Sequence, residues 1–127
     1  MLIEDYVSFE TAKLLKEKGF NGLCTAYYDC FTTDNFHCGN EPTDFNSIDT
    51  KIRDIVAAPT LQMAMKWLRE VHHLTIDVFH FRDWKVNIKT IPDDYFKADY
   101  SYPELKPAET HEQACEVAIK YCLENLI

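Results

Sequence analysis

The residues with the clearest metal-binding chemistry lie within one stretch of fifteen residues: Cys24, Cys30, His37 and Cys38. Zinc prefers thiolate and imidazole ligands, usually supplied by cysteine pairs two to four residues apart. The spacing here is irregular, and the adjacent His37 and Cys38 are awkward as two ligands of one ion. We therefore expect Cys24 and Cys30 to pack on a strand and His37-Cys38 to lie in a loop, with no bound cofactor. A small zinc-binding protein using Cys30, His37 and Cys38 remains the alternative.

A second group of titratable residues comprises His72, Asp77 and His80. Such groups can bind a metal or transfer protons near neutral pH. Side chains alternate between the two faces of a strand, so Asp77 and His80 should point to opposite faces. We expect His72 to be a core histidine with its hydrogen bonds satisfied, and His80 to lie beside Trp84 at the end of a hairpin. A third group lacks the residue order and the glycine of a calcium loop, and we reject it: Asp44, Asn46 and Asp49.

Signatures of the common enzyme classes are absent from the sequence. The chain has only three glycines, so neither a phosphate-binding loop nor a dinucleotide fingerprint is present. No G-x-S-x-G or H-E-x-x-H pattern occurs. The sequence favours a non-catalytic protein, although catalytic groups that are distant in sequence would leave no local signature.

The stretch 92–109 mixes aromatic with acidic residues, and its candidate contact residues are Tyr95, Phe96, Tyr100 and Tyr102. Aromatic residues are enriched at protein interfaces. Two interpretations remain open. The stretch is either a surface that binds a partner protein, or a loop that lies across a sheet with its rings buried.

Three helices are predicted from their ends. The first begins after the N-cap Ser8 and ends at Gly19, where Phe20 folds back on the helix. The second runs from Thr60 to about His73, and its wide apolar arc includes Met63, Leu68 and Val71. The third begins at the capping-box sequence Thr110-His111-Glu112-Gln113 and continues to about Asn125, with Val117 at the flank of its apolar face.

A β-hairpin is predicted between the second and third helices, with strands 74–81 and 84–91. A loop of odd length keeps the apolar faces together and pairs His80 with Trp84, so we expect that register. Another strand is predicted over 23–31, followed by a long loop over 32–50. The segment 51–58 fits either a helical turn or a short strand at Ile55-Val56.

These elements predict a single α+β domain over residues 1–127. Three helices should cover one face of a small antiparallel sheet, in the order α-β-loop-α-β-β-loop-α. A chain of 127 residues has the usual length for one domain.

The formal net charge of −8 is concentrated in the stretches 29–58 and 92–116. An acidic surface repels a phosphate backbone, so direct nucleic-acid binding is disfavoured. An acidic mimic of nucleic acid remains an alternative. No apolar run approaches the ~20 residues that cross a bilayer, and the first residues carry acids where a signal peptide carries bases. We expect a cytoplasmic protein with no membrane partner and five reduced cysteines. A homodimer is compatible with the sequence.

Three segments carry a resemblance: Ser8-Phe9-Glu10-Thr11-Ala12-Lys13-Leu14-Leu15, then the run from Ala57-Ala58-Pro59-Thr60-Leu61 through Trp67-Leu68-Arg69-Glu70 with the hairpin after it, and Tyr121-Cys122-Leu123. The chain resembles a group of small proteins of phages, prophages and mobile elements of gut anaerobic bacteria. The resemblance implies a genomic setting and gives no information about catalytic activity or site residues. We predict an accessory or protein-interaction module that binds another protein.

Overall fold

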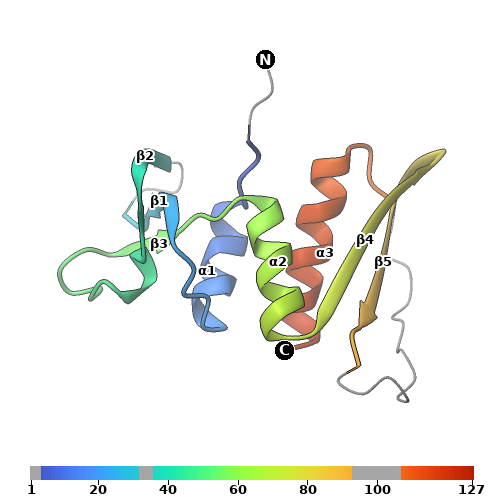
Figure 1. Cartoon of the computed structure of the whole chain (residues 1–127). Helices are drawn as coiled ribbons and strands as arrows, with labels where there is room; N and C mark the ends of the chain where they lie inside the picture. The colour runs from blue at the N-terminus through green and yellow to red at the C-terminus, as the bar shows by residue number, and fades with distance from the viewer. Residues whose placement is uncertain (1–3, 32–35, 93–106) are drawn as a thin grey trace. The chain divides into compact units, whose positions relative to one another are not determined.

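The computed structural model describes residues 4–31, 36–92 and 107–127 (Figure 1). It has three helices and two small antiparallel sheets, so the predicted α+β class and the order of the predicted elements are confirmed. Two sheets replace the one that the sequence predicts. The chain forms two compact units, residues 1–60 and 61–127, and each has one of the sheets. A single domain over residues 1–127 remains a prediction.

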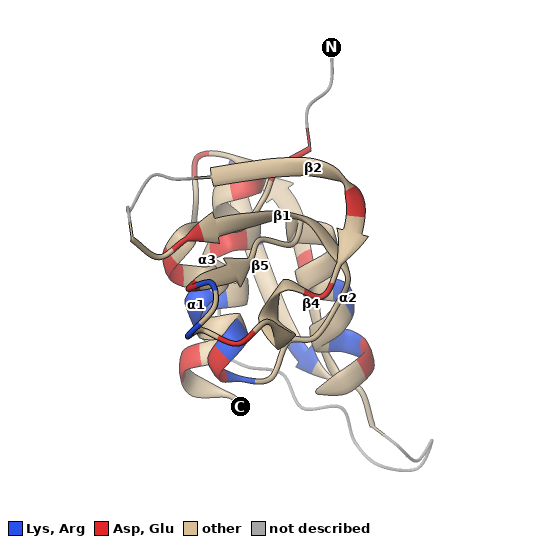
Figure 2. Ribbon diagram, turned by 90° about the vertical axis from the view of Figure 1, so that its left-hand side faces the viewer, with Lys and Arg blue, Asp and Glu red and all other residues tan. Residues whose placement is uncertain are grey.

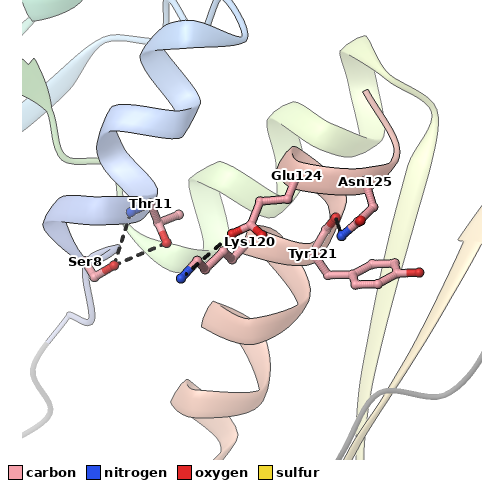
Figure 3. A network of polar contacts seen from close by, with 6 residues as sticks. All are labelled: Ser8, Thr11, Lys120, Tyr121, Glu124 and Asn125. Carbon is pink, nitrogen blue, oxygen red and sulfur yellow. Dashed lines mark hydrogen bonds and ion pairs between the residues drawn. The ribbon is translucent and has the colours of Figure 1, made fainter.

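In the first unit, α1 spans Phe9–Glu17 and has the predicted ends. The Ser8 hydroxyl accepts a hydrogen bond of 3.2 Å from the backbone N–H of Thr11 (Figure 3). Gly19 has a φ of 91°, a left-handed conformation that costs glycine little. The N–H of Phe20 donates to the Leu15 carbonyl at 2.9 Å, and that of Gly19 to the Lys16 carbonyl at 3.1 Å. Both hydrogen bonds of a Schellman ending are therefore present.

The sheet of the first unit has the strand order β2-β1-β3 and is antiparallel throughout. Its strands are β1 (Cys24–Asp29), β2 (Phe36–Thr43) and β3 (Ile55–Ala57). The strand interpretation of Ile55-Val56 is therefore the correct one. Helix α1 packs against β3, and Ala12 and Leu15 on its inner face are fully buried.

The prediction of a loop over 32–50 is wrong for two of its segments, which form β2 and the 3-10 helix η1 (Phe45–Ser47). Strand β2 contains Gly39 and Pro42, which disfavour strands locally. It is held by contacts with residues that are distant in sequence. The ring of Phe36 lies 5.1 Å from that of Tyr6 and 5.3 Å from that of Tyr28. A local pattern carries no sign of such contacts.

The second unit contains α2 (Leu61–Val71), β4 (Leu74–Phe81), β5 (Asp83–Thr90) and α3 (His111–Asn125). The hairpin has the predicted register, with His80 opposite Trp84. Arg82 stands alone at the turn with a φ of 68°. Both helices contact the hairpin, and the side chains buried on its inner face are Leu74, Val86 and Ile88.

The two helices of this unit differ slightly from their predictions. The apolar arc predicted for α2 includes Met63 and Val71, but both side chains are exposed. At the start of α3, the Thr110 hydroxyl accepts the N–H of Gln113 at 3.1 Å, as a capping box requires. The side chain of Gln113 accepts from the N–H of Glu109 at 3.3 Å, one residue before the expected donor. Near its other end, Lys120 and Glu124 form an ion pair of 3.8 Å (Figure 3).

Candidate functional site

The four candidate zinc ligands do not converge. Cys24 is buried in β1, and its thiol lies 3.7 Å from the carbonyl of Gly22. His37 and Cys38 are neighbours on β2 and so point to opposite faces. The ring of His37 stacks on Tyr27 with centroids 5.0 Å apart, and the sulfur of Cys38 lies 3.5 Å from the Tyr6 hydroxyl. Over the described ranges of the chain, no three His, Cys, Asp or Glu side chains are placed to hold a metal.

The environment of the cysteines favours protonated thiols. Burial raises the pKa of Cys24 to about 11, with a smaller contribution from the charge of Asp44. Burial alone raises the pKa of Cys122 to about 12. The pKa of Cys30 is also raised, first by burial and then by the nearby charge of Asp54. All five cysteines are free thiols. Metal binding and nucleophilic attack both need the thiolate, which these three sites disfavour.

The second titratable group is also dispersed. Asp77 faces Asn87 on the side of the hairpin opposite to His80, and His80 lies against Trp84 as predicted. The prediction that His72 is a satisfied core histidine is wrong. Its Nε2 is buried and, within the described residues, has no hydrogen-bond partner. The strand alternation separates Asp77 from His80, whereas the missing partner of His72 depends on tertiary packing.

The rejected calcium group has a structural role at Asn46. The amide nitrogen of Asn46 donates to the carbonyl of Phe20 at 3.0 Å, and its oxygen accepts the N–H of Ala57 at 2.8 Å. The side chain thereby ties the end of α1 to β3. One carboxylate oxygen of Asp44 is buried and, among the residues described, has no partner. These contacts join parts of the fold and do not form a ligand shell.

The predicted interaction residues Tyr95, Phe96, Tyr100 and Tyr102 lie outside the described residues. The end of the same stretch, 107–109, is described. Ala108 pairs with Trp84 on β5 through two backbone hydrogen bonds of 3.1 and 2.9 Å. This pairing fixes the segment that leads into α3.

Trp84 is the centre of a row of ring contacts at the same place. Its ring centroid lies 5.0 Å from that of His80 and 5.1 Å from that of His111. The Nδ1 of His111 lies 3.7 Å from the sulfur of Cys115, which is fully buried. Backbone pairing and side-chain packing at Trp84 therefore both anchor the first turn of α3 to the hairpin.

A groove lies beside this anchor, between residues 107–109 and the first two turns of α3. It has a volume of about 660 Å³. We call it the α3 groove, and the described residues in its lining are Pro107, Ala108, Glu109, Gln113, Glu116 and Val117. Three of these side chains are apolar and two are carboxylates. Val117 is 45% exposed, although it is a large apolar residue.

The helix pattern places Val117 at the flank of the buried face of α3 and therefore does not predict the α3 groove. A signal was nonetheless present. Gln113, Val117 and Lys120 follow one another at spacings of four and three, so they share a face of the helix. A valine between two polar residues on one face indicates an exposed apolar spot.

Comparison with known proteins gives no relative: no family model, no curated protein and no solved structure matches the chain. The phage or mobile-element setting therefore remains a prediction from the resemblance of short segments. Across residues 4–31, 36–92 and 107–127, no helix is long and apolar enough to cross a membrane.

Proposed function

We propose that the chain is a non-catalytic protein-interaction module that binds another protein through the α3 groove. The observation that carries the proposal is an apolar hollow of about 660 Å³ with two carboxylates in its lining. Apolar surface left open to water on a small protein commonly marks an interaction site. Residues 107–109 of the groove also belong to the stretch 92–109, for which a surface that binds a partner protein is one of the two interpretations left open by the sequence.

The lining of the groove defines the chemistry of its partner. Pro107, Ala108 and Val117 provide the apolar surface, and an apolar side chain of the partner would be buried against them. Glu109 and Glu116 carry negative charge on the same surface. Complementary charge directs partner choice and orientation. The groove therefore fits a segment in which an apolar side chain is flanked by lysine or arginine.

The groove is held in shape by contacts within its own unit. Ala108 is fixed by its pairing with Trp84, and Gln113 is fixed by its hydrogen bonds with Thr110 and Glu109. A preformed site loses less conformational entropy when it binds, which favours affinity. The anchoring of α3 is thus part of the proposed function.

The two alternatives have less support. A zinc protein needs converging ligands, and Cys30, His37 and Cys38 do not provide them in the described fold. A nucleic-acid mimic needs a surface of one sign. Basic and acidic residues both occur along α1 and α2 (Figure 2), and in α1 Glu10 and Glu17 flank Lys13 and Lys16. We retain the cytoplasmic location and the accessory role in a phage or mobile element as parts of the proposal, on the sequence evidence alone.

The test is binding of three synthetic peptides of equal length, in which leucine alternates with lysine, glutamate or serine. Isotope-labelled protein is titrated with each peptide and followed by amide chemical shifts. We expect saturable shifts at Ala108, Gln113 and Val117 with the lysine peptide alone. The double variant Glu109→Lys/Glu116→Lys should lose this binding.

A matched control keeps general electrostatic attraction apart from recognition. The double variant Glu17→Lys/Glu41→Lys makes the same change of net charge at exposed positions in the first unit. It should bind the lysine peptide as the unmodified chain does. Equal losses in both double variants, or equal binding of the glutamate peptide, would contradict the α3 groove as the binding site.

A further inference from the structure

Among the described residues, the outer edge of β4 is not paired with another strand. The second sheet consists of β4 and β5 alone, so among the described residues no strand pairs with the other side of β4. Strand β4 has eight residues and an unbroken register from Leu74 to Phe81, without a bulge or a proline. Proteins usually protect such edges with bulges, prolines or charges, because exposed backbone groups pair with other strands.

The other long edge strand shows this protection. In β2, the register shifts between the pairs Cys24–Thr43 and Ala26–Cys38, which inserts a bulge. Pro42 lies in the bulge and removes a backbone donor. The only carboxylate of β4 is Asp77, and the exposed residues that follow it on the same face are Phe79 and Phe81. Strand β4 lacks the bulge and the proline that protect β2, so its edge is suited to pairing with another strand.

The hydrogen bonds show which backbone groups of β4 face outward. Both backbone groups of Trp84 bond to Ala108, so its partner His80 is a non-hydrogen-bonded pair in the hairpin. The N–H of Ile91 donates to the carbonyl of His73 at 2.7 Å, which agrees with the same alternation. In an antiparallel ladder the two kinds of pair alternate. The N–H and C=O groups of Leu74, Ile76, Val78 and His80 therefore point to the outer edge.

We propose that this edge binds the same edge of a second copy of the chain, forming a continuous antiparallel sheet β5-β4-β4-β5 with Val78 opposite Val78. Ile76 and His80 lie at equal distances from Val78, whereas an axis at Asp77 would set the two Asp77 carboxylates directly opposite each other. A two-fold axis there pairs Ile76 with His80 in both directions and satisfies every outward group between them. Such an isologous interface is the commonest arrangement of homodimers.

The side chains fit this register. The pairing sets Asp77 opposite Phe79 of the second copy, so the two Asp77 carboxylates do not face each other. The Phe79 rings of the two copies lie diagonally adjacent on the outer face, within reach of each other. Phe79 is 41% exposed and Phe81 62% exposed in the single chain. Pairing removes part of this surface from water, and it leaves the α3 groove out of the interface.

The test is sedimentation equilibrium of the full chain from low micromolar to near-millimolar concentration, with three variants. The unmodified chain should form a dimer. Phe79→Glu places a carboxylate opposite Asp77 of the second copy and should give a monomer, since like charges directly opposite repel. The double variant Asp77→Lys/Phe79→Glu sets a lysine opposite each glutamate and should restore the dimer. Phe81→Glu lies opposite Thr75 and should leave the dimer in place.

Tryptophan fluorescence and circular dichroism would test whether each variant is folded. In the hairpin, Phe79 is paired with Lys85, so a glutamate at position 79 gains an opposite charge and the monomer keeps its stability. A chain that stays monomeric at every concentration overturns the proposal. So does a dimer that survives Phe79→Glu, an equal loss in Phe81→Glu, or a double variant that stays monomeric.

Discussion

The imidazole of His72 lies edge-on to the indole of Trp67, with ring centroids 4.7 Å apart and ring planes at 73°. The Nε2 of His72 is buried and, in the described part of the chain, has no hydrogen-bond partner. Burial lowers the pKa of this histidine, and the charge of His73 lowers it further. The folded second unit therefore prefers the neutral imidazole.

We predict that the second unit loses stability as the pH falls. The folded pKa of His72 lies below its usual value near 6.5, so the unfolded chain takes up the proton first. The stabilisation is complete above about pH 6.5 and decreases as the pH falls toward the folded pKa. Both tryptophans belong to the second unit, so urea unfolding followed by tryptophan fluorescence measures this unit.

The variant His72→Phe isolates this contribution. It keeps a ring beside Trp67 and removes the titrating group, so the dependence of unfolding free energy on pH should become shallower. His37→Gln changes an exposed histidine in the first unit and should leave the dependence unaltered. An unchanged slope in His72→Phe would show that other groups cause the pH dependence.

The ending of α1 predicts a cost for a side chain at position 19. Gly19 has a φ of 91°, and a Cβ built there meets no atom within 4 Å. The cost of Gly19→Ala is therefore backbone strain alone, about 1 kcal/mol of unfolding free energy. Asparagine tolerates this conformation better, so Gly19→Asn should cost less. Chemical unfolding followed by far-ultraviolet circular dichroism measures the order of the two variants, and equal costs would count against the strain.

Two residues of α2 predict opposite outcomes for truncation. Leu68 is fully buried, and Leu68→Ala should lower the unfolding free energy by about 2–5 kcal/mol through lost burial and a cavity. Val71 is 54% exposed although the sequence places it on the apolar arc. Val71→Ala should change stability by less than about 0.5 kcal/mol. Urea unfolding followed by tryptophan fluorescence measures the unfolding free energy of both variants. A large loss of unfolding free energy in Val71→Ala would mean that this residue is buried in solution.

The cysteines should differ in their reaction with iodoacetamide at neutral pH. Cys38 is exposed on β2 and should be alkylated first. Cys24 and Cys122 are buried and have pKa values of about 11 and about 12, so they should react only after unfolding. Peptide mass spectrometry at successive times gives the order. Early alkylation of Cys122 in folded protein would contradict the packing of α3.

Local chemistry in the sequence determined the helices and the hairpin. Ser8 and Gly19 mark the ends of α1 because capping and a left-handed residue need only nearby backbone groups. The hairpin register follows from the alternation of apolar residues, since any slip by one position would mix its faces. These features depend on a few neighbouring residues, and the sequence contains all of them.

Only the tertiary structure decided the features that depend on distant residues. Strand β2 forms in spite of a sequence that favours a loop, and its Phe36 packs on Tyr6, which is distant in sequence, and on Tyr28 of β1. The α3 groove appears because Ala108 pairs with Trp84 and so places residues 107–109 beside the helix. That the outer edge of β4 has no paired strand among the described residues follows only from the pairing of all the described strands. Contacts between distant segments depend on the whole chain, and no local pattern records them.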